Sequence, residues 1–168
     1  NQNTFDALQI HGGSGFMMDY PIQRYYRDAR ITNIYEGTPQ LQVVAAIRYV
    51  TNGSYLAQMR EFEQAEVSEA GKHLQGQAKA LADLFEQAVE HVKEAQSQEM
   101  QDLCARHLVE MAADVIMLHL LCRNATQQPE LFEKSARVYA RFVTAEVQKH
   151  HTWVMDMTAE ALADYRCE

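Results

Sequence analysis

Residues 74–92 read LQGQAKALADLFEQAVEHV, and this stretch decides the fold that the sequence predicts. Its apolar side chains recur every three or four residues, which places them on one face of an α-helix. The same spacing returns in residues 104–122, CARHLVEMAADVIMLHLLC. Each helix must bury its apolar face against a neighbour, so the sequence predicts an all-α helical bundle. The residues expected on the two buried faces are Leu74, Ala78, Leu81, Phe85, Ala88 and Val92, and Cys104, Leu108, Met111, Val115, Leu118 and Cys122.

Glycine and proline divide the rest of the chain into a turn-rich first part and a helix-rich second part. Five of the seven glycines and two of the three prolines lie in the first 53 residues. Pro21 and the pair Thr38-Pro39 suit helix starts, and no segment alternates as a strand does. We expect an up-and-down bundle domain over residues 54–168, after a shorter domain over residues 1–53. The helices are expected near residues 2–11, 21–29, 38–51, 55–66, 68–95, 98–125 and 129–165.

The side chains around the bundle faces carry further expectations. Residues 115–122 are apolar nearly all round, which predicts a central place in the bundle or at a subunit interface. Four methionines, Met111, Met117, Met155 and Met157, are expected to fill the core. No histidine follows a glutamate by three residues, as di-iron bundles require, so no metal site is predicted.

Composition and charge exclude several classes of function. Fifteen basic and 23 acidic residues give a net charge of −8, which argues against a nucleic-acid surface. No apolar run approaches the roughly 20 residues that span a bilayer, so no transmembrane segment is expected. The three cysteines, Cys104, Cys122 and Cys167, form no Cys-x-x-Cys pair, which disfavours a thiolate zinc site and fits a reducing compartment.

Residues 7–48 hold the features that point to chemistry. The turn Gly12-Gly13-Ser14-Gly15 lets a polar ligand approach Gln9 and the backbone N–H groups, although the same residues fit an ordinary helix end. Glu36 lies in a turn before a helix start, where the helix dipole is positive. Taken alone, this glutamate is better explained as an ordinary charge at a helix start.

The order and spacing of these features resemble the last catalytic-domain helices of the acyl-CoA dehydrogenase family. The matching motifs are QIHGG (9–13), GF (15–16), YP (20–21), RYYRDARI (24–31), IYEGT (34–38), QLQ (40–42) and Arg48. The sequence departs from common family patterns at Phe16, Pro39 and Val43, which leaves the acyl-chain preference open. Residues 54–168 are similar, by helical character and position, to the extra helical domain of the larger family members.

The resemblance implies an FAD-dependent enzyme that converts an acyl-CoA thioester to a trans-2-enoyl-CoA. Glu36 would be the catalytic base that removes the α-proton, and Tyr35, Glu36 and Gly37 would bind the substrate. Two sets of residues would bind FAD. Thr38, Pro39 and Gln40 would contact the flavin cofactor. The diphosphate or adenine end of the FAD of a neighbouring subunit would be bound by Gln9, Ile10, His11, Gly12 and Gly13.

The implied partners are an acyl-CoA substrate, an electron-transfer flavoprotein and further copies of the chain in a dimer or tetramer. The implied compartment is the bacterial cytoplasm, or the mitochondrial matrix in a eukaryote. The chain is interpreted as a carboxy-terminal fragment that is inactive alone. Two alternatives stay open: a non-catalytic helical module for oligomerisation, and an acyl-CoA oxidase that passes electrons to oxygen.

Overall fold

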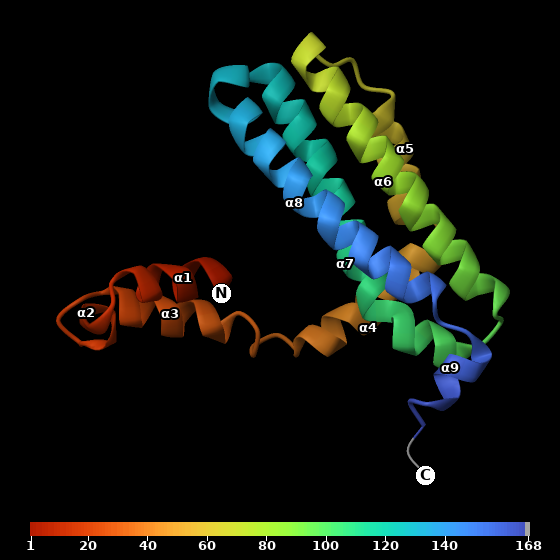
Figure 1. Ribbon diagram of the computed structural model, residues 1–168, viewed down its shortest axis with the longest axis horizontal. Coiled ribbons are helices and arrows are strands. Elements are labelled where there is room, and N and C mark those ends of the chain that lie inside the picture. Colours follow the sequence, from red (N-terminus) through yellow and green to blue (C-terminus); the bar gives the residue numbers. More distant parts are fainter. Residues whose placement is uncertain (167–168) are drawn as a thin grey trace. The chain divides into compact units, whose positions relative to one another are not determined.

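The computed structural model describes residues 1–166, and over these residues it consists of helices and turns without a strand (Figure 1). The predicted all-α fold is confirmed. The chain divides into two compact units, Asn1–Gln42 and the residues from Val43 onward. The helices of the described residues are α1 (Gln2–Ile10), α2 (Gly13–Phe16), α3 (Ile22–Ile31), α4 (Pro39–Thr51), α5 (Ser54–Glu63), α6 (Glu69–Glu94), α7 (Gln98–Gln127), α8 (Pro129–Met155) and α9 (Ala159–Ala163).

In the first unit, α1 lies beside α3, and the single turn of α2 contacts both. The rings of Phe5 and Tyr26 join α1 to α3, with their centroids 6.3 Å apart. Gly15 is buried, and a Cβ added there would lie 2.5 Å from the backbone oxygen of Leu8. Glycine therefore allows α2 to approach α1 this closely.

Two details of this unit differ from the sequence prediction. The glycine-rich segment was expected to be a plain turn, but Gly13–Phe16 forms a helical turn because Gly15 can pack on the α1 backbone. Pro21 precedes α3 instead of opening it, although its backbone is already helical at φ −69°. The helix then runs to Ile31, two residues beyond the expected end.

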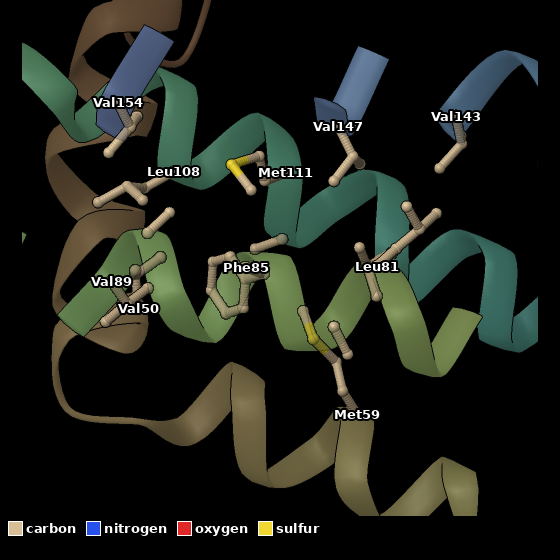
Figure 2. Packing of buried hydrophobic residues seen from close by; sticks show 14 of the residues in the cluster. Val50, Met59, Leu81, Phe85, Val89, Leu108, Met111, Val143, Val147 and Val154 are labelled. Carbon is tan, nitrogen blue, oxygen red and sulfur yellow. The ribbon is translucent and has the colours of Figure 1, made fainter. Parts of the chain in front are cut away.

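In the second unit, α6, α7 and α8 pack against one another, and α5 lies against α6 and α7. Every residue expected on the two buried faces is at most 3% exposed. Figure 2 shows Phe85 of α6, Met111 of α7 and Val147 of α8 converging in the core. Val43, Ile47 and Val50 of α4 join the same cluster, so the second half of α4 belongs to this unit.

Serine side chains cap the starts of α6 and α7. Ser68 Oγ accepts a hydrogen bond from the Gly71 N–H at the start of α6, and Ser97 Oγ accepts one from the Met100 N–H at the start of α7, both at 3.2 Å. Such a cap satisfies a backbone donor that the first helical turn leaves free. Pro129 opens α8, as expected from its position.

The last predicted helix, residues 129–165, is wrong only near its end, because α8 ends at Met155 and a separate helix, α9, begins at Ala159. The Met157 carbonyl freed by this break accepts a hydrogen bond from His91 Nε2 at 2.8 Å. Thr158 Oγ1 then accepts from the Ala161 N–H at 3.1 Å and starts α9. The break turns Met157 and Leu162 into the core, where each is 4% exposed.

The expectation that four methionines fill the core is half wrong. Met111 and Met157 are buried, but Met117 and Met155 are 48% and 39% exposed. Met117 lies on the outward side of residues 115–122, whereas Val115, Leu118 and Cys122 of that segment are buried. Exposed apolar side chains also form a row on α8, made of Leu131, Val138 and Phe142.

Candidate active site

Glu36 lies in a turn between α3 and α4 whose backbone is left-handed at two successive residues. Its φ is +57°, and that of Gly37 is +97°. Glycine adopts this region readily, whereas a residue with a Cβ loses roughly 1–2 kcal/mol there. The side-chain amide of Gln42, in the second turn of α4, donates from Nε2 to the Glu36 carbonyl at 2.8 Å. This bond holds the turn against the helix that follows it.

The Glu36 side chain is exposed, and so is the ring of Tyr35 beside it. Over residues 1–166, no hydrogen bond or salt bridge engages the Glu36 carboxylate. A Cβ built on Gly37 would lie 3.4 Å from the Leu41 side chain, which is ordinary contact, so the left-handed backbone is what favours glycine there. The turn therefore presents a carboxylate that is free to take up a proton from a bound molecule.

The residues that follow the turn form the start of α4. Thr38 Oγ1 accepts from the Leu41 N–H at 3.4 Å, a long capping contact, and Pro39 is the first residue of the helix. Thr38, Pro39 and Gln40 are all exposed. Their polar groups are therefore accessible to a ligand that covers the first turn of α4.

The second predicted set, residues 9–13, lies at the carboxyl end of α1. Gly12 has φ +58°, and a Cβ added at Gly12 or at Gly13 would meet no atom within 4 Å. Gln9, Ile10 and His11 are exposed, and His11 Nδ1 lies 2.8 Å from the Ala7 carbonyl oxygen, to which it donates. The exposed side-chain amide of Gln9 is a donor for an anionic group such as a diphosphate, and the glycines leave the approach to it open, which is the extent to which these residues fit FAD as a ligand.

The structure places these two sets at opposite ends of the α1–α3 pair. Asn1 Nδ2 donates to Asn33 Oδ1 at 2.9 Å, which ties the first residue to the end that leads into the Glu36 turn. The nine residues of α1 then span about 14 Å at 1.5 Å per residue before Ile10 is reached. Within Asn1–Gln42, residues 9–13 and residues 35–40 thus lie apart from each other.

Sequence reasoning missed the part of Gln42 in this site. The glutamine was recognised within the motif QLQ, but its bond to the Glu36 carbonyl depends on the left-handed turn, which brings together residues six apart. The sequence signal is the Glu-Gly pair, since glycine after a polar residue often marks a left-handed turn. Among residues 1–166, no group of three or more His, Cys, Asp or Glu side chains is arranged to hold a metal ion.

Comparison with known proteins assigns both parts of the chain to related models. Residues 2–49 match the family model described as "Acyl-CoA dehydrogenase, C-terminal domain", and residues 51–162 match the one described as "Acyl-CoA dehydrogenase C terminal". A solved structure of an acyl-CoA dehydrogenase family protein from Porphyromonas gingivalis is also similar. It has a TM-score of 0.64 and 36% identity, and the match covers 68% of this chain and 98% of that one.

Curated relatives match a short part of the chain. The chain is 61% identical over 44 residues to an acryloyl-CoA reductase (NADH) of Anaerotignum propionicum, and 49% identical over 51 residues to an acyl-CoA dehydrogenase of Bacillus subtilis. These segments are 26% and 30% of this chain, and they span only 11% and 14% of the two relatives.

Proposed function

Because the chain belongs to the acyl-CoA dehydrogenase family, we propose that it carries the catalytic base of an FAD-dependent acyl-CoA dehydrogenase, and that this base is Glu36. The observation that carries the proposal is the Glu36 turn, where an exposed and unpaired carboxylate stands between the end of α3 and the start of α4. A carboxylate already bonded to an arginine or lysine would be a weaker base, whereas this one is available to a substrate.

Each residue of the turn has a proposed part in the reaction. The Glu36 carboxylate takes the proton from the α-carbon of the acyl-CoA thioester, and the pair of electrons left behind forms the α,β double bond. The Glu36 N–H donates to the thioester carbonyl and stabilises the negative charge that develops on its oxygen. Gly37 leaves room for the thioester, and the Tyr35 ring lies against the substrate. The product is a trans-2-enoyl-CoA.

FAD, when bound, accepts the β-hydrogen as hydride. The exposed groups of Thr38, Pro39 and Gln40 are proposed to contact the flavin end, next to the base. Residues 9–13 are proposed to bind the diphosphate or adenine end of a second FAD molecule, the one that serves the neighbouring subunit. The two sets lie about the length of α1 apart. This separation supports their assignment to two different FAD molecules, because the Glu36 turn and residues 9–13 need not contact the same one.

The same site suits the reverse reaction, which is our second candidate. An acryloyl-CoA reductase and a 3-(aryl)acrylate reductase are 61% and 62% identical to this chain over 44 and 37 residues. In that direction Glu36 would give its proton to the α-carbon, and reduced FAD, when bound, would supply the hydride for the β-carbon. A base that takes a proton in one direction returns it in the other, so the Glu36 turn serves both.

The electron acceptor, the assembly and the location are proposed on family grounds. We propose an electron-transfer flavoprotein as acceptor, with oxygen, as in an acyl-CoA oxidase, as the alternative that a measurement of peroxide would reveal. We also propose a homodimer or homotetramer in the bacterial cytoplasm or the mitochondrial matrix. The exposed row Leu131, Val138 and Phe142 supports association, because a large apolar patch is unusual on a monomer.

The two parts of the chain have different proposed roles. Residues 1–53 complete a catalytic domain, and residues 54–168 form an additional helical domain. The family builds its flavin site from more than this chain, so we propose that these 168 residues alone do not oxidise acyl-CoA. A non-catalytic oligomerisation module would keep the bundle but would never bind flavin in a longer protein.

The decisive experiment is Glu36→Gln in a full-length acyl-CoA dehydrogenase that contains this segment. The amide keeps the size of the side chain but cannot take a proton, so flavin reduction by acyl-CoA should slow by about 10³-fold or more. Flavin absorbance and the affinity for enoyl-CoA should stay near wild type, and the exposed change Asp28→Asn should leave the rate unchanged. Normal flavin reduction in the Glu36→Gln enzyme would show that another residue is the base.

A further inference from the structure

Two histidines from different helices of the second unit are in direct contact. His107 lies on α7 and His150 on α8, and their Nδ1 atoms are 2.7 Å apart. The rings meet edge to face, with centroids 5.0 Å apart. At this distance the two nitrogens form a hydrogen bond, so one of them carries a proton and the other a lone pair.

A glutamate decides which nitrogen carries the proton. His150 Nε2 lies 3.2 Å from Glu110 Oε2, and an ionised carboxylate only accepts hydrogen bonds. A bare Nε2 would set its lone pair against this carboxylate, whereas a protonated Nε2 is attracted to it, so we infer that the neutral His150 ring is protonated on Nε2 and bare on Nδ1. His107 then donates from Nδ1. Arg106 fixes the Glu110 carboxylate from its other oxygen, because Arg106 Nε donates to Glu110 Oε1 at 2.8 Å.

This arrangement accepts one more proton but not two. A first proton can bind His107 Nε2 without disturbing the bond between the rings, and it makes His107 a stronger donor. A second proton can bind only His150 Nδ1, the atom that accepts the bond. Two imidazolium rings would then face each other with a proton on each contacting nitrogen, and the link between α7 and α8 would break.

The surroundings also oppose a second positive charge. Burial lowers the pKa of His150, which is 7% exposed, and burial with the nearby His150 lowers the pKa of His107. The charged groups that face the pair from both helices act in both directions, because the acidic ones raise the two pKa values and the basic ones lower them, but the lowering by burial is larger. These charged groups are Arg106, Glu110 and Asp114 on α7, and Glu146 and Lys149 on α8.

Trp153 makes the state of this pair visible. Its ring stacks on His107, with centroids 3.9 Å apart and planes 19° from parallel, and it is the single tryptophan of the chain. An imidazolium so close to an indole changes the fluorescence of the indole, and separation of the helices would move the two rings apart. Emission from Trp153 therefore reports both protonation and opening.

We propose that His107 and His150 form an acid-sensitive contact that ties α7 to α8 with one shared proton and opens when a second proton binds. The contact is independent of the catalytic proposal, because all of its residues lie in the second unit. The sign of the pH effect follows from the lowered pKa values. The stabilisation is complete above the ordinary histidine pKa of about 6.5, and it is lost as the pH falls through the lower values of the folded state.

The first test is to assign the tautomers by nitrogen NMR of the imidazole rings in the intact chain at about pH 7.5. We expect a proton on Nδ1 of His107 and on Nε2 of His150. A proton on Nε2 of both rings, with both Nδ1 atoms bare, would overturn the proposal, because no hydrogen bond could then join them. This measurement needs no variant and is independent of any effect on folding.

The second test follows Trp153 fluorescence and the urea midpoint from pH 8 to pH 4.5. In the wild type we expect an acid change in fluorescence, and an unfolding equilibrium constant that rises by up to about tenfold per pH unit for each proton that unfolding takes up. His150→Asn keeps an acceptor for His107 but cannot titrate. Its unfolding should therefore take up about one proton fewer than that of the wild type, and its stability should fall less steeply with decreasing pH. The exposed His73→Asn should behave as the wild type.

Two results would count against the contact. Equal acid sensitivity in His150→Asn and the wild type would show that the pair does not govern the response. Quenching of Trp153 by equimolar Zn²⁺ that EDTA reverses would show that the two Nδ1 atoms are metal ligands instead.

Discussion

At the scale of single residues, the sequence indicates which side chains are candidates for catalysis better than it indicates which side chains touch. Glu36 was selected as the base from the motif IYEGT, and its exposure in a tight turn supports that proposal. Its left-handed backbone and the bond from Gln42 were not foreseen, because they depend on dihedral angles that a motif does not state. The contact between His107 and His150 joins residues 43 apart, and no local pattern shows such a pair.

His119 leads to a prediction at the same scale. It is 3% exposed beside a cavity of about 80 Å³, and within residues 1–166 its Nε2 has no hydrogen-bond partner. Since an unpaired buried polar group costs about 1–3 kcal/mol, His119→Leu should raise the free energy of unfolding by about 1 kcal/mol. Urea unfolding at pH 7.5 measures this, and the exposed His73→Leu is the control.

The same variant should also be less sensitive to acid. Burial lowers the pKa of His119, so the unfolded chain takes up a proton first as the pH falls below about 6.5. The wild type therefore loses stability between pH 7.5 and pH 5.5, and His119→Leu should lose less. Equal losses in the two proteins would mean that His119 is already hydrated and charged in the folded state.

At the scale of helices, the periodicity of apolar residues predicts well that a helix exists and which of its faces is buried. It predicts the first and last residues of a helix less well. Every residue expected on the faces of α6 and α7 is buried, because a long amphipathic helix has only one way to bury its apolar stripe. The α8–α9 break was missed, since Asp156, Met157 and Thr158 hold no glycine or proline. What ends α8 there is a contact from another helix, the bond from His91 to the Met157 carbonyl.

Thr158→Ala tests that break. It removes the side-chain oxygen that accepts from the Ala161 N–H and should weaken α9 locally by about 1 kcal/mol. Hydrogen exchange should quicken at Ala161 and Leu162, while the amides in the middle of α7 keep their protection. The exposed Thr152→Ala, inside α8, should leave exchange in α9 unchanged. Unchanged exchange in Thr158→Ala would show that core burial of Leu162 is sufficient to hold α9.

Gly15 and Gly13 in the first unit allow the role of a glycine in helix packing to be tested separately from its role in ligand access. A Cβ at Gly15 would meet the Leu8 backbone oxygen at 2.5 Å, so Gly15→Ala should force α2 away from α1 and destabilise this unit by about 1–3 kcal/mol. A Cβ at Gly13 would meet nothing within 4 Å, so Gly13→Ala should fold normally. NMR line positions of Phe5 and Tyr26 would show the difference.

The two variants should also differ in a full-length enzyme. Gly13→Ala should weaken FAD binding while leaving the fold intact, because the added methyl covers the backbone that we assign to the cofactor. If Gly13→Ala bound FAD as tightly as the wild type, residues 9–13 would lose their assignment as a cofactor site.

At the scale of the whole molecule, the sequence indicated where the chain changes character. Glycine becomes rarer after Gly53, where only Gly71 and Gly76 follow, and this change separates the part with the proposed catalytic residues from the part with the main hydrophobic core. The structure adds that the last residues of α4 already belong to the second core, through Val43, Ile47 and Val50. Composition could not show this, because a helix that leaves one unit and enters another has an unbroken sequence pattern.

Phe85 is the largest side chain at the centre of that core and leads to a stability prediction for the second unit (Figure 2). Phe85→Ala leaves a cavity among α6, α7 and α8 and should reduce the free energy of unfolding by about 3–5 kcal/mol. Phe142→Ala removes the same atoms from a side chain that is 57% exposed, so it should change stability by no more than about 0.5 kcal/mol. Thermal and urea unfolding of the two variants measure the contrast, and similar losses would contradict the described packing.

The left-handed backbone at Glu36 has a consequence for attempts to evolve a more thermostable protein in the laboratory. A library screened only for survival at high temperature would favour glycine at this position, since glycine relieves the dihedral penalty that glutamate bears. Each such variant would be more stable but would lack the carboxylate that we propose as the proton acceptor. Persistence of glutamate at position 36 through rounds of thermal selection would therefore require that turnover be selected as well.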